Sequence, residues 1–163
     1  MLIDILIPTY NRAKDTLANL EALQQEIAKN DLWNTVQIIV SDNCSTDQTE
    51  EFVQVFSDNK DKRLALQYYR NDSNIGLEPN ALAVLSKASS PYVLFLGDDD
   101  FLAPDYLKYC CDSIAKHPEL GCIIPGILSV FSDGQTKDVR GNHAEKILKP
   151  GFEAVLEDRK SVV

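Results

Sequence analysis

Three consecutive aspartates, Asp98, Asp99 and Asp100, follow a short apolar segment at Tyr92 to Leu96. Adjacent carboxylates repel one another, so a fold that gathers them needs water, cations or hydrogen-bond donors to offset the repulsion. Mg²⁺ typically binds one or two protein carboxylates together with substrate phosphates, so the triplet predicts a metal site that holds a phosphate. A solvated acidic turn that caps the next helix is an equally good interpretation of this spacing.

A second polar group, Asp42 and Asn43, follows the apolar residues Val36 to Val40. Their side chains present acceptors that suit the ring N–H of a pyrimidine base. Turns and helix caps use the same residue types, and for this segment alone they are the favoured interpretation. Ser45 and Gln48 have the spacing of a capping box, which predicts that a helix opens here.

A third group follows the apolar residues Leu2 to Ile7. Pro8 fixes the direction in which the chain leaves this segment. Tyr10 offers a ring for a flat base, and Arg12 offers a fork for a phosphate or a carboxylate, although each is also an ordinary loop residue. A weaker fourth group is the turn Asn74, Ile75 and Gly76, which precedes a helix. Asn80, one helical turn later, could face the same crevice as the other three groups.

Short strands that alternate with amphipathic helices must position these groups. β-branched and aromatic content predicts strands at residues 2–7, 36–40, 64–69 and 92–96. Apolar residues at helical spacing predict helices that contain residues 17–27, 52–56, 81–88 and 107–114. This order predicts an α/β protein with a mostly parallel sheet and helices on both faces. Ligands bind beyond the carboxyl ends of the strands in such sheets, and all four groups lie there.

The pattern changes after about Gly121. Residues 122–125 and 127–131 could be further strands, followed by a polar turn at 132–134, and residues 152–156 suggest one short helix. The four cysteines and two histidines show no metal-ligand spacing, so we expect reduced, buried thiols and no zinc site.

Composition excludes several classes of protein. The 163 residues are 44% hydrophobic, as in an ordinary globular domain. The formal net charge of −9 and the absence of a basic cluster argue against binding of nucleic acid. The apolar runs are far shorter than the ~20 residues of a membrane-spanning helix, and the first residues lack the basic start of a signal peptide. We therefore expect a soluble, cytoplasmic protein.

Four segments, taken jointly, resemble the family 2 glycosyltransferases of the GT-A fold. Their order, spacing and placement at strand ends match over roughly residues 2–135. The segments are IPTYNR at 7–12, VSDNCSTD at 40–47, NIG at 74–76 and FLGDDD at 95–100. The form with one glycine and three aspartates resembles enzymes that build bacterial surface polysaccharides, including those that attach deoxyhexoses.

The resemblance implies a GT-A nucleotide-binding sandwich, with a donor-binding core at residues 1–135. Residues 136–163 would begin an acceptor region, and the chain is expected to be a truncated piece because members of the family continue beyond this point. The implied ligands are a nucleotide-sugar donor, with UDP or TDP expected first, and a Mn²⁺ or Mg²⁺ ion.

The resemblance also assigns residues to the base of the donor. Pro8, Thr9 and Tyr10 would line the base, and Asp42 with Asn43 would meet the base edge and the ribose. Members of the family often have paired aspartates where this chain has Asp42 and Asn43. The position that reads the base, and hence the identity of the base, stays open.

The acidic triplet would hold the ribose and the diphosphate. Asp98 would contact the ribose side, and Asp99 would coordinate the metal that bridges the two phosphates. If Pro104 fixes the register, Gly97 stands where the family has the first acid of its Asp-x-Asp motif. This leaves Asp99 as the expected metal ligand and Asp100 as the next candidate for that role.

An inverting member of the family also needs a carboxylate base that takes the proton of the acceptor hydroxyl. The pair Glu157 and Asp158 makes Asp158 the candidate, with a solvated helix end as the favoured alternative. Apart from Asp158, the catalytic residues stay unknown.

The predicted function is the transfer of a hexose or deoxyhexose from a nucleoside diphosphate sugar to a hydroxyl of a glycan or lipid-linked acceptor. A peripheral membrane association through the missing region would place the reaction at the inner face of the membrane. The alternatives are a nucleotidyltransferase and a catalytically incomplete nucleotide-binding module. A nucleotidyltransferase more often has a glycine-rich phosphate loop after its first strand, and residues 8–12 contain no glycine.

Overall fold

The computed structural model describes residues 1–131 and 133–140 of the chain. The chain forms two compact units, which divide after Ser113. The first unit carries a four-stranded sheet and the second a two-stranded sheet. Across the described residues, no helix has the length and apolar character needed to cross a membrane.

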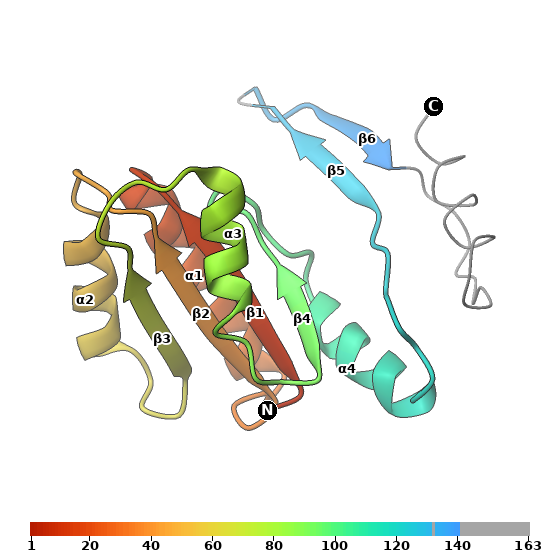
Figure 1. Cartoon of the computed structure of the whole chain (residues 1–163). Helices are drawn as coiled ribbons and strands as arrows, with labels where there is room; N and C mark the ends of the chain where they lie inside the picture. Colours follow the sequence, from red (N-terminus) through yellow and green to blue (C-terminus); the bar gives the residue numbers. More distant parts are fainter. Residues whose placement is uncertain (132, 141–163) are drawn as a thin grey trace. The chain divides into compact units, whose positions relative to one another are not determined.

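A parallel sheet forms the centre of the first unit, with the strands in the order β3, β2, β1, β4 (Figure 1). The strands are β1 (Ile3–Thr9), β2 (Val36–Asp42), β3 (Ala65–Arg70) and β4 (Tyr92–Phe95). β1 pairs in parallel with β2 and β4, and β2 pairs in parallel with β3. The chain runs outward from β1 to β3 and then returns to β4, so the strand order reverses between β1 and β4.

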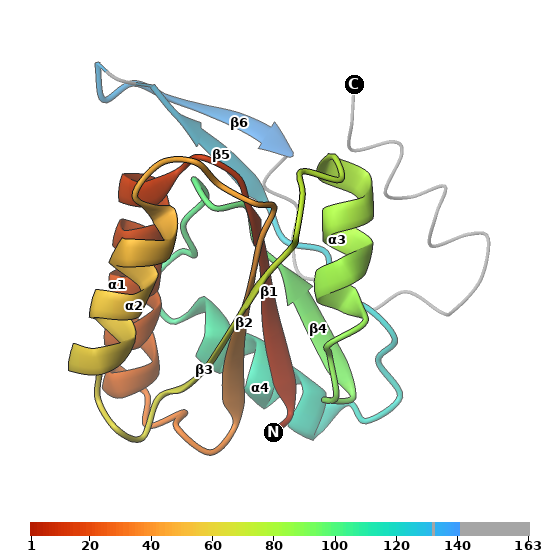
Figure 2. The ribbon, with the colours of Figure 1, turned by 60° about the vertical axis from the view of Figure 1, so that its left-hand side comes forward.

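Helices cover both faces of this sheet, as Figure 2 shows. α1 (Ala13–Lys29), α2 (Thr49–Asn59) and α3 (Leu77–Leu85) lie in the first unit, and α4 (Tyr106–Lys116) spans the division between the two units. α1 and α2 pack against each other on one face, whereas α3 contacts β1 and β2 on the other face. This arrangement confirms the predicted α/β fold with a parallel sheet between helices.

Burial on both faces explains the continuous apolar runs of the central strands. On the face of α3, Leu6, Ile39 and Val84 form a fully buried cluster. Leu20 and Ile27 of α1 are also fully buried and recur at helical spacing. The core therefore fixes the two central strands and leaves their carboxyl ends to carry polar residues.

Predictions for the region after residue 121 have different outcomes. β5 (Ile127–Val130) confirms one predicted strand and pairs in an antiparallel manner with β6 (Thr136–Arg140), which the sequence did not predict. The strand predicted at 122–125 is wrong, because these residues adopt no regular structure. Its last residue is a proline, which lacks an N–H for a strand ladder. The helix predicted at 152–156 lies outside the described residues.

Candidate functional site

The predicted site residues meet at the carboxyl edge of the parallel sheet. β1 and β2 run further than predicted, so Pro8 and Thr9 end β1 and Asp42 ends β2. Thr9 is paired with Asp42 across the two strands. On its other side, Thr9 Oγ1 donates a hydrogen bond to Asp98 Oδ2 at 2.7 Å. The strand order reverses between β1 and β4, which is the position where open α/β sheets bind ligands.

Asp98 is the half-buried member of the acidic triplet. Because Thr9 donates its one hydroxyl hydrogen to Asp98, Thr16 of α1 is the donor in its contact with Thr9, at 2.9 Å between the hydroxyl oxygens. Burial raises the pKa of Asp98 above its ordinary value, although the Thr9 hydrogen bond and the charge of Arg12 oppose this. Asp98 therefore accepts at the outer end of a short hydroxyl chain whose inner members, Thr9 and Thr16, are buried.

Asp99 and Arg12 form an exposed ion pair beside Asp98. Arg12 Nη1 lies 2.8 Å from Asp99 Oδ2, and the two side chains are 48% and 52% exposed. The charges of Asp99 and Asp98 raise the pKa of Arg12 above its ordinary value. An exposed pair contributes little to stability, so a ligand can compete for either partner. Tyr10 is also exposed on this loop, so its ring is available to a base.

Gly97 allows the carboxylates of Asp99 and Asp100 to converge. A Cβ atom at position 97 would lie 2.7 Å from Asp100 Oδ2 and 3.3 Å from Asp99 Oδ1, so the two carboxylates border the space that a side chain would fill. The described residues contain no group of three His, Cys, Asp or Glu side chains placed to hold a metal. Mg²⁺ and similar ions use one or two carboxylates with phosphates and water. The residues present therefore fit a divalent ion that binds jointly with a diphosphate.

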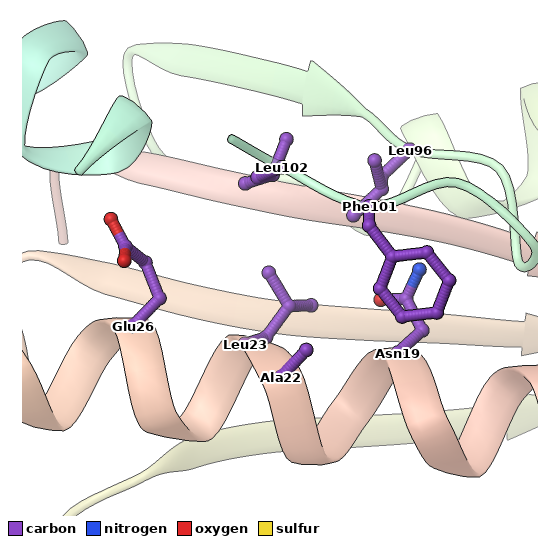
Figure 3. A pocket seen from close by; sticks show the side chains of 7 residues that line it. All are labelled: Asn19, Ala22, Leu23, Glu26, Leu96, Phe101 and Leu102. Atoms are coloured by element: carbon purple, nitrogen blue, oxygen red, sulfur yellow. The ribbon is translucent and has the colours of Figure 1, made fainter. Parts of the chain in front are cut away.

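Asn19 of α1 holds the turn that carries these carboxylates, a contact that sequence reasoning missed. The Asn19 side chain is buried, and its Nδ2 donates to the backbone carbonyls of Gly97, at 3.1 Å, and of Asp100. Asn19 lines a small cavity together with Leu23 and Phe101 (Figure 3). Only its position among the apolar residues of the helix marks it in the sequence.

Asp42 is completely buried, and the chain itself satisfies its carboxylate. One oxygen accepts hydrogen bonds from the backbone N–H and the hydroxyl of Ser45. The other oxygen accepts from the Tyr68 hydroxyl at 2.7 Å and from Arg70 Nε at 3.3 Å. Burial and the hydrogen bond to Asp42 raise the pKa of Tyr68, so the phenol keeps the proton that it donates. The structure makes Asp42 an anchor of its loop, and its contact with a base stays a prediction.

Asn43 and Asn80 belong to a buried set of amides beside that loop. Asn43 Oδ1 accepts from the N–H of Ile75 at 2.9 Å, and its Nδ2 donates to Asn74 Oδ1 at 2.8 Å. Asn80 accepts from Ser41 Oγ at 2.8 Å and donates to the Ser41 carbonyl at 3.0 Å. Both side chains hold the start of α3 to β2, and their predicted contacts with a donor stay predictions.

Asn11 and Asp47 connect the loops after β1 and β2, a connection that sequence reasoning also missed. Asn11 Oδ1 accepts from the N–H of Thr46 at 2.7 Å. The Asp47 carboxylate accepts from the N–H of Thr49 at 3.0 Å and from the N–H of Ala13 at 3.1 Å. Burial raises the pKa of Asp47, but the hydrogen bond from the Thr49 hydroxyl, together with those from the two N–H groups, outweighs it and lowers the pKa overall. One carboxylate therefore caps the first turns of both α1 and α2.

The predicted capping box of Ser45 and Gln48 is wrong. Gln48 precedes the first residue of α2 and makes no capping hydrogen bond with its side chain. Ser45 directs its hydroxyl to Asp42, and the carboxylate of Asp47, one residue before the N-cap position, bonds the first N–H of α2 instead. An aspartate two residues before the helix is the sequence signal that could have identified this cap. Asp158, the candidate base, lies outside the described residues.

Known proteins resemble this chain over most of its length. The chain is 41% identical over 135 residues to abequosyltransferase RfbV of Salmonella typhimurium, and the match covers 75% of this chain and 38% of that protein. It is 30% identical over 118 residues to the poly(ribitol-phosphate) beta-N-acetylglucosaminyltransferase TarS of Staphylococcus aureus, which is 72% of this chain and 19% of that protein. The chain therefore spans less than half the length of these relatives.

Solved structures share the fold. The crystal structure of residues 1–349 of Staphylococcus aureus TarS in complex with UDP-GlcNAc has a TM-score of 0.63 and 26% sequence identity. The match covers 77% of this chain and 37% of that chain. The family described as glycosyl transferase family 2 matches residues 4–160. The resemblance of the four strand-end segments is thereby confirmed, and the chain belongs to glycosyl transferase family 2.

Proposed function

We propose that this chain is the donor-binding part of a glycosyltransferase. It would transfer a hexose or deoxyhexose from a nucleoside diphosphate sugar to a hydroxyl of a surface glycan or a lipid-linked intermediate. One observation carries the proposal: the carboxylates of Asp99 and Asp100 converge over Gly97, next to the exposed guanidinium of Arg12. This set of charges is complementary to a diphosphate with a divalent cation.

The proposed roles follow from the exposure and the contacts of each residue. Asp99 and Asp100 would hold a Mn²⁺ or Mg²⁺ ion, which as a Lewis acid would stabilise the charge that develops on the departing diphosphate. Arg12 would exchange its ion pair with Asp99 for a phosphate oxygen, because a guanidinium binds either anion. Asp98, fixed by Thr9, would accept a hydrogen bond from the ribose.

The base of the donor would lie against the exposed ring of Tyr10 and the ends of β1 and β2. Asp42 and Asn43 are saturated by the chain, so they would shape this part of the site and reach a base only by exchanging a partner. We propose UDP first among the nucleotides, which agrees with UDP-GlcNAc as the ligand of the similar TarS structure.

The remaining part of the proposal concerns how the acceptor hydroxyl is bound and deprotonated. We propose that residues 1–135 form the donor-binding core and that residues 136–163 begin the acceptor region, with Asp158 as the candidate base. The proposed location is the cytoplasm, at the inner face of the membrane, where a lipid-linked acceptor would be available.

Calorimetric titration of the chain with UDP, TDP, GDP and CDP, with and without Mn²⁺, tests the proposal. We expect one nucleotide to bind in a metal-dependent manner, and Asp99→Ala to abolish this binding. Asp112→Ala is the matched control, because Asp112 is also 52% exposed and ion-paired, but on α4 with Lys108. Binding without sugar transfer would favour the catalytically incomplete module, and no binding of any nucleotide would contradict the proposal.

A further inference from the structure

Asn19 is an unusual residue for its place in α1. It is 1% exposed and lies on the same helix stripe as the buried residues Thr16, Leu20 and Leu23. Asparagine is a poor helix former, and burial of its amide is costly unless hydrogen bonds satisfy it. An apolar side chain would suit the core better at this position, so the amide must stabilise something specific.

The amide contacts both ends of the acidic turn through the backbone alone. Nδ2 donates to the carbonyl of Gly97 at 3.1 Å and to the carbonyl of Asp100. The N–H of Asp100 closes the same turn onto the Gly97 carbonyl at 3.1 Å. Because none of these bonds uses a carboxylate, the side chains of Asp99 and Asp100 stay available to a ligand.

The orientation of the amide is fixed by its two acceptors. If Oδ1 and Nδ2 were exchanged, Oδ1 would face two carbonyl oxygens and be repelled by both. As placed, Oδ1 is buried and has no hydrogen-bond partner among the described residues. The cavity that Asn19 lines measures about 20 Å³, which is enough for one water molecule. The chain thus leaves one buried acceptor without a protein partner so that both N–H bonds are directed to the turn.

We propose that Asn19 is a positioning residue, which acts through the Gly97–Asp100 turn to set the separation of the two metal-binding carboxylates. This inference rests on the proposed function, since it assumes that Asp99 and Asp100 hold the ion. Asn19 is neutral and exerts its effect at any pH. Residues that orient metal ligands in this way typically change metal affinity 10- to 100-fold when they are replaced.

Asn19→Leu removes the two donors while keeping a side chain of similar size. Leu23→Ala is the matched control, because Leu23 is 3% exposed, lies one turn along the same helix and lines the same cavity. Two measurements apply to the full chain. Hydrogen exchange of the Asp100 amide, without metal, reports on the turn itself. Electron paramagnetic resonance of Mn²⁺ in the presence of UDP reports on the affinity for the ion.

We expect Asn19→Leu to speed exchange of the Asp100 amide and to weaken Mn²⁺ binding at least tenfold, whereas Leu23→Ala lowers the melting temperature and leaves both unchanged. If Asn19→Leu fails to fold, Asn19→Ser offers a shorter donor and should give an intermediate Mn²⁺ affinity. Equal Mn²⁺ affinity in the wild type and Asn19→Leu would overturn the positioning role. If the wild type binds no Mn²⁺ with UDP, TDP, GDP or CDP, the proposed function fails, while the exchange experiment still shows whether Asn19 holds the turn.

Discussion

The ends of β2 and β4 both carry acidic residues at one edge of the sheet, but their surroundings differ completely. At the end of β2, the chain supplies four hydrogen-bond donors to the buried carboxylate of Asp42. After β4, Asp99 is half exposed and pairs with Arg12, a contact that a ligand can replace. A buried carboxylate whose hydrogen bonds all come from the chain stabilises the fold. An exposed carboxylate with one replaceable partner is available for binding a ligand.

The largest expected effect is on stability, at the end of β2. Asp42→Ala removes the buried carboxylate that accepts from Ser45, Tyr68 and Arg70, and the loss of hydrogen bonds to a buried charged group lowers the free energy of unfolding by about 3 kcal/mol. Denaturant unfolding measures this change. Asp42→Asn, which keeps one acceptor oxygen, should lose less than Asp42→Ala. If Asp42→Ala unfolded at the same denaturant concentration as the wild type, the structural role of Asp42, and with it the difference between the two strand ends, would be contradicted.

The next effect is on binding, after β4. Asp100→Asn removes one of the two carboxylates that border the space over Gly97, and we expect Mn²⁺ affinity in the presence of UDP to fall about tenfold. The free energy of unfolding should change by less than about 0.5 kcal/mol, as for most surface substitutions. Calorimetry and denaturant unfolding on the same preparation check both values. A stability loss as large as that of Asp42→Ala would show that this carboxylate is structural.

Gly97→Ala sharpens the comparison without a change of charge. The added Cβ would lie 2.7 Å from Asp100 Oδ2 and must displace that carboxylate. Because the displaced atom ends a flexible side chain, we expect a stability change below about 1 kcal/mol but a several-fold loss of Mn²⁺ affinity. Gly134→Ala, in the second unit with open space around the glycine but a φ of 81°, is the contrasting control. It should lower stability and leave Mn²⁺ binding unchanged.

The smallest expected effect is the pH dependence of Asp98. Burial raises its pKa in the folded state, so the folded chain holds this proton more tightly than the unfolded chain. The resulting stabilisation is complete below the ordinary pKa of 3.8 and is lost as pH rises through the raised value. Asp98→Asn should lack this dependence and, at neutral pH, unfold at the same or a slightly higher denaturant concentration. An identical pH profile for both proteins would assign the dependence to another group.

The sequence was sufficient for the part of the site that depends on strand ends. Parallel strands place their carboxyl ends at one edge, so Thr9, Asp42 and Asp98 could be expected together before their contacts were known. It was insufficient for Asn19 and Asp47. Asn19 bonds residues 78 and 81 positions away, and Asp47 bonds Ala13 34 positions away, so no local spacing specifies these contacts. Only the bond between Asp47 and Thr49 is local. The capping box failed for a local reason instead, because the Ser45 hydroxyl bonds the buried Asp42 three residues earlier and Gln48 makes no capping bond.

Asp47 has a consequence for anyone who redesigns this scaffold. Its carboxylate is shared between the first turns of two helices, so the loops after β1 and β2 are coupled parts. A loop grafted after β2 without an acid at this position would release the segment that carries Tyr10 and Arg12 as well. New nucleotide preferences are therefore best engineered by exchanging both loops as a unit.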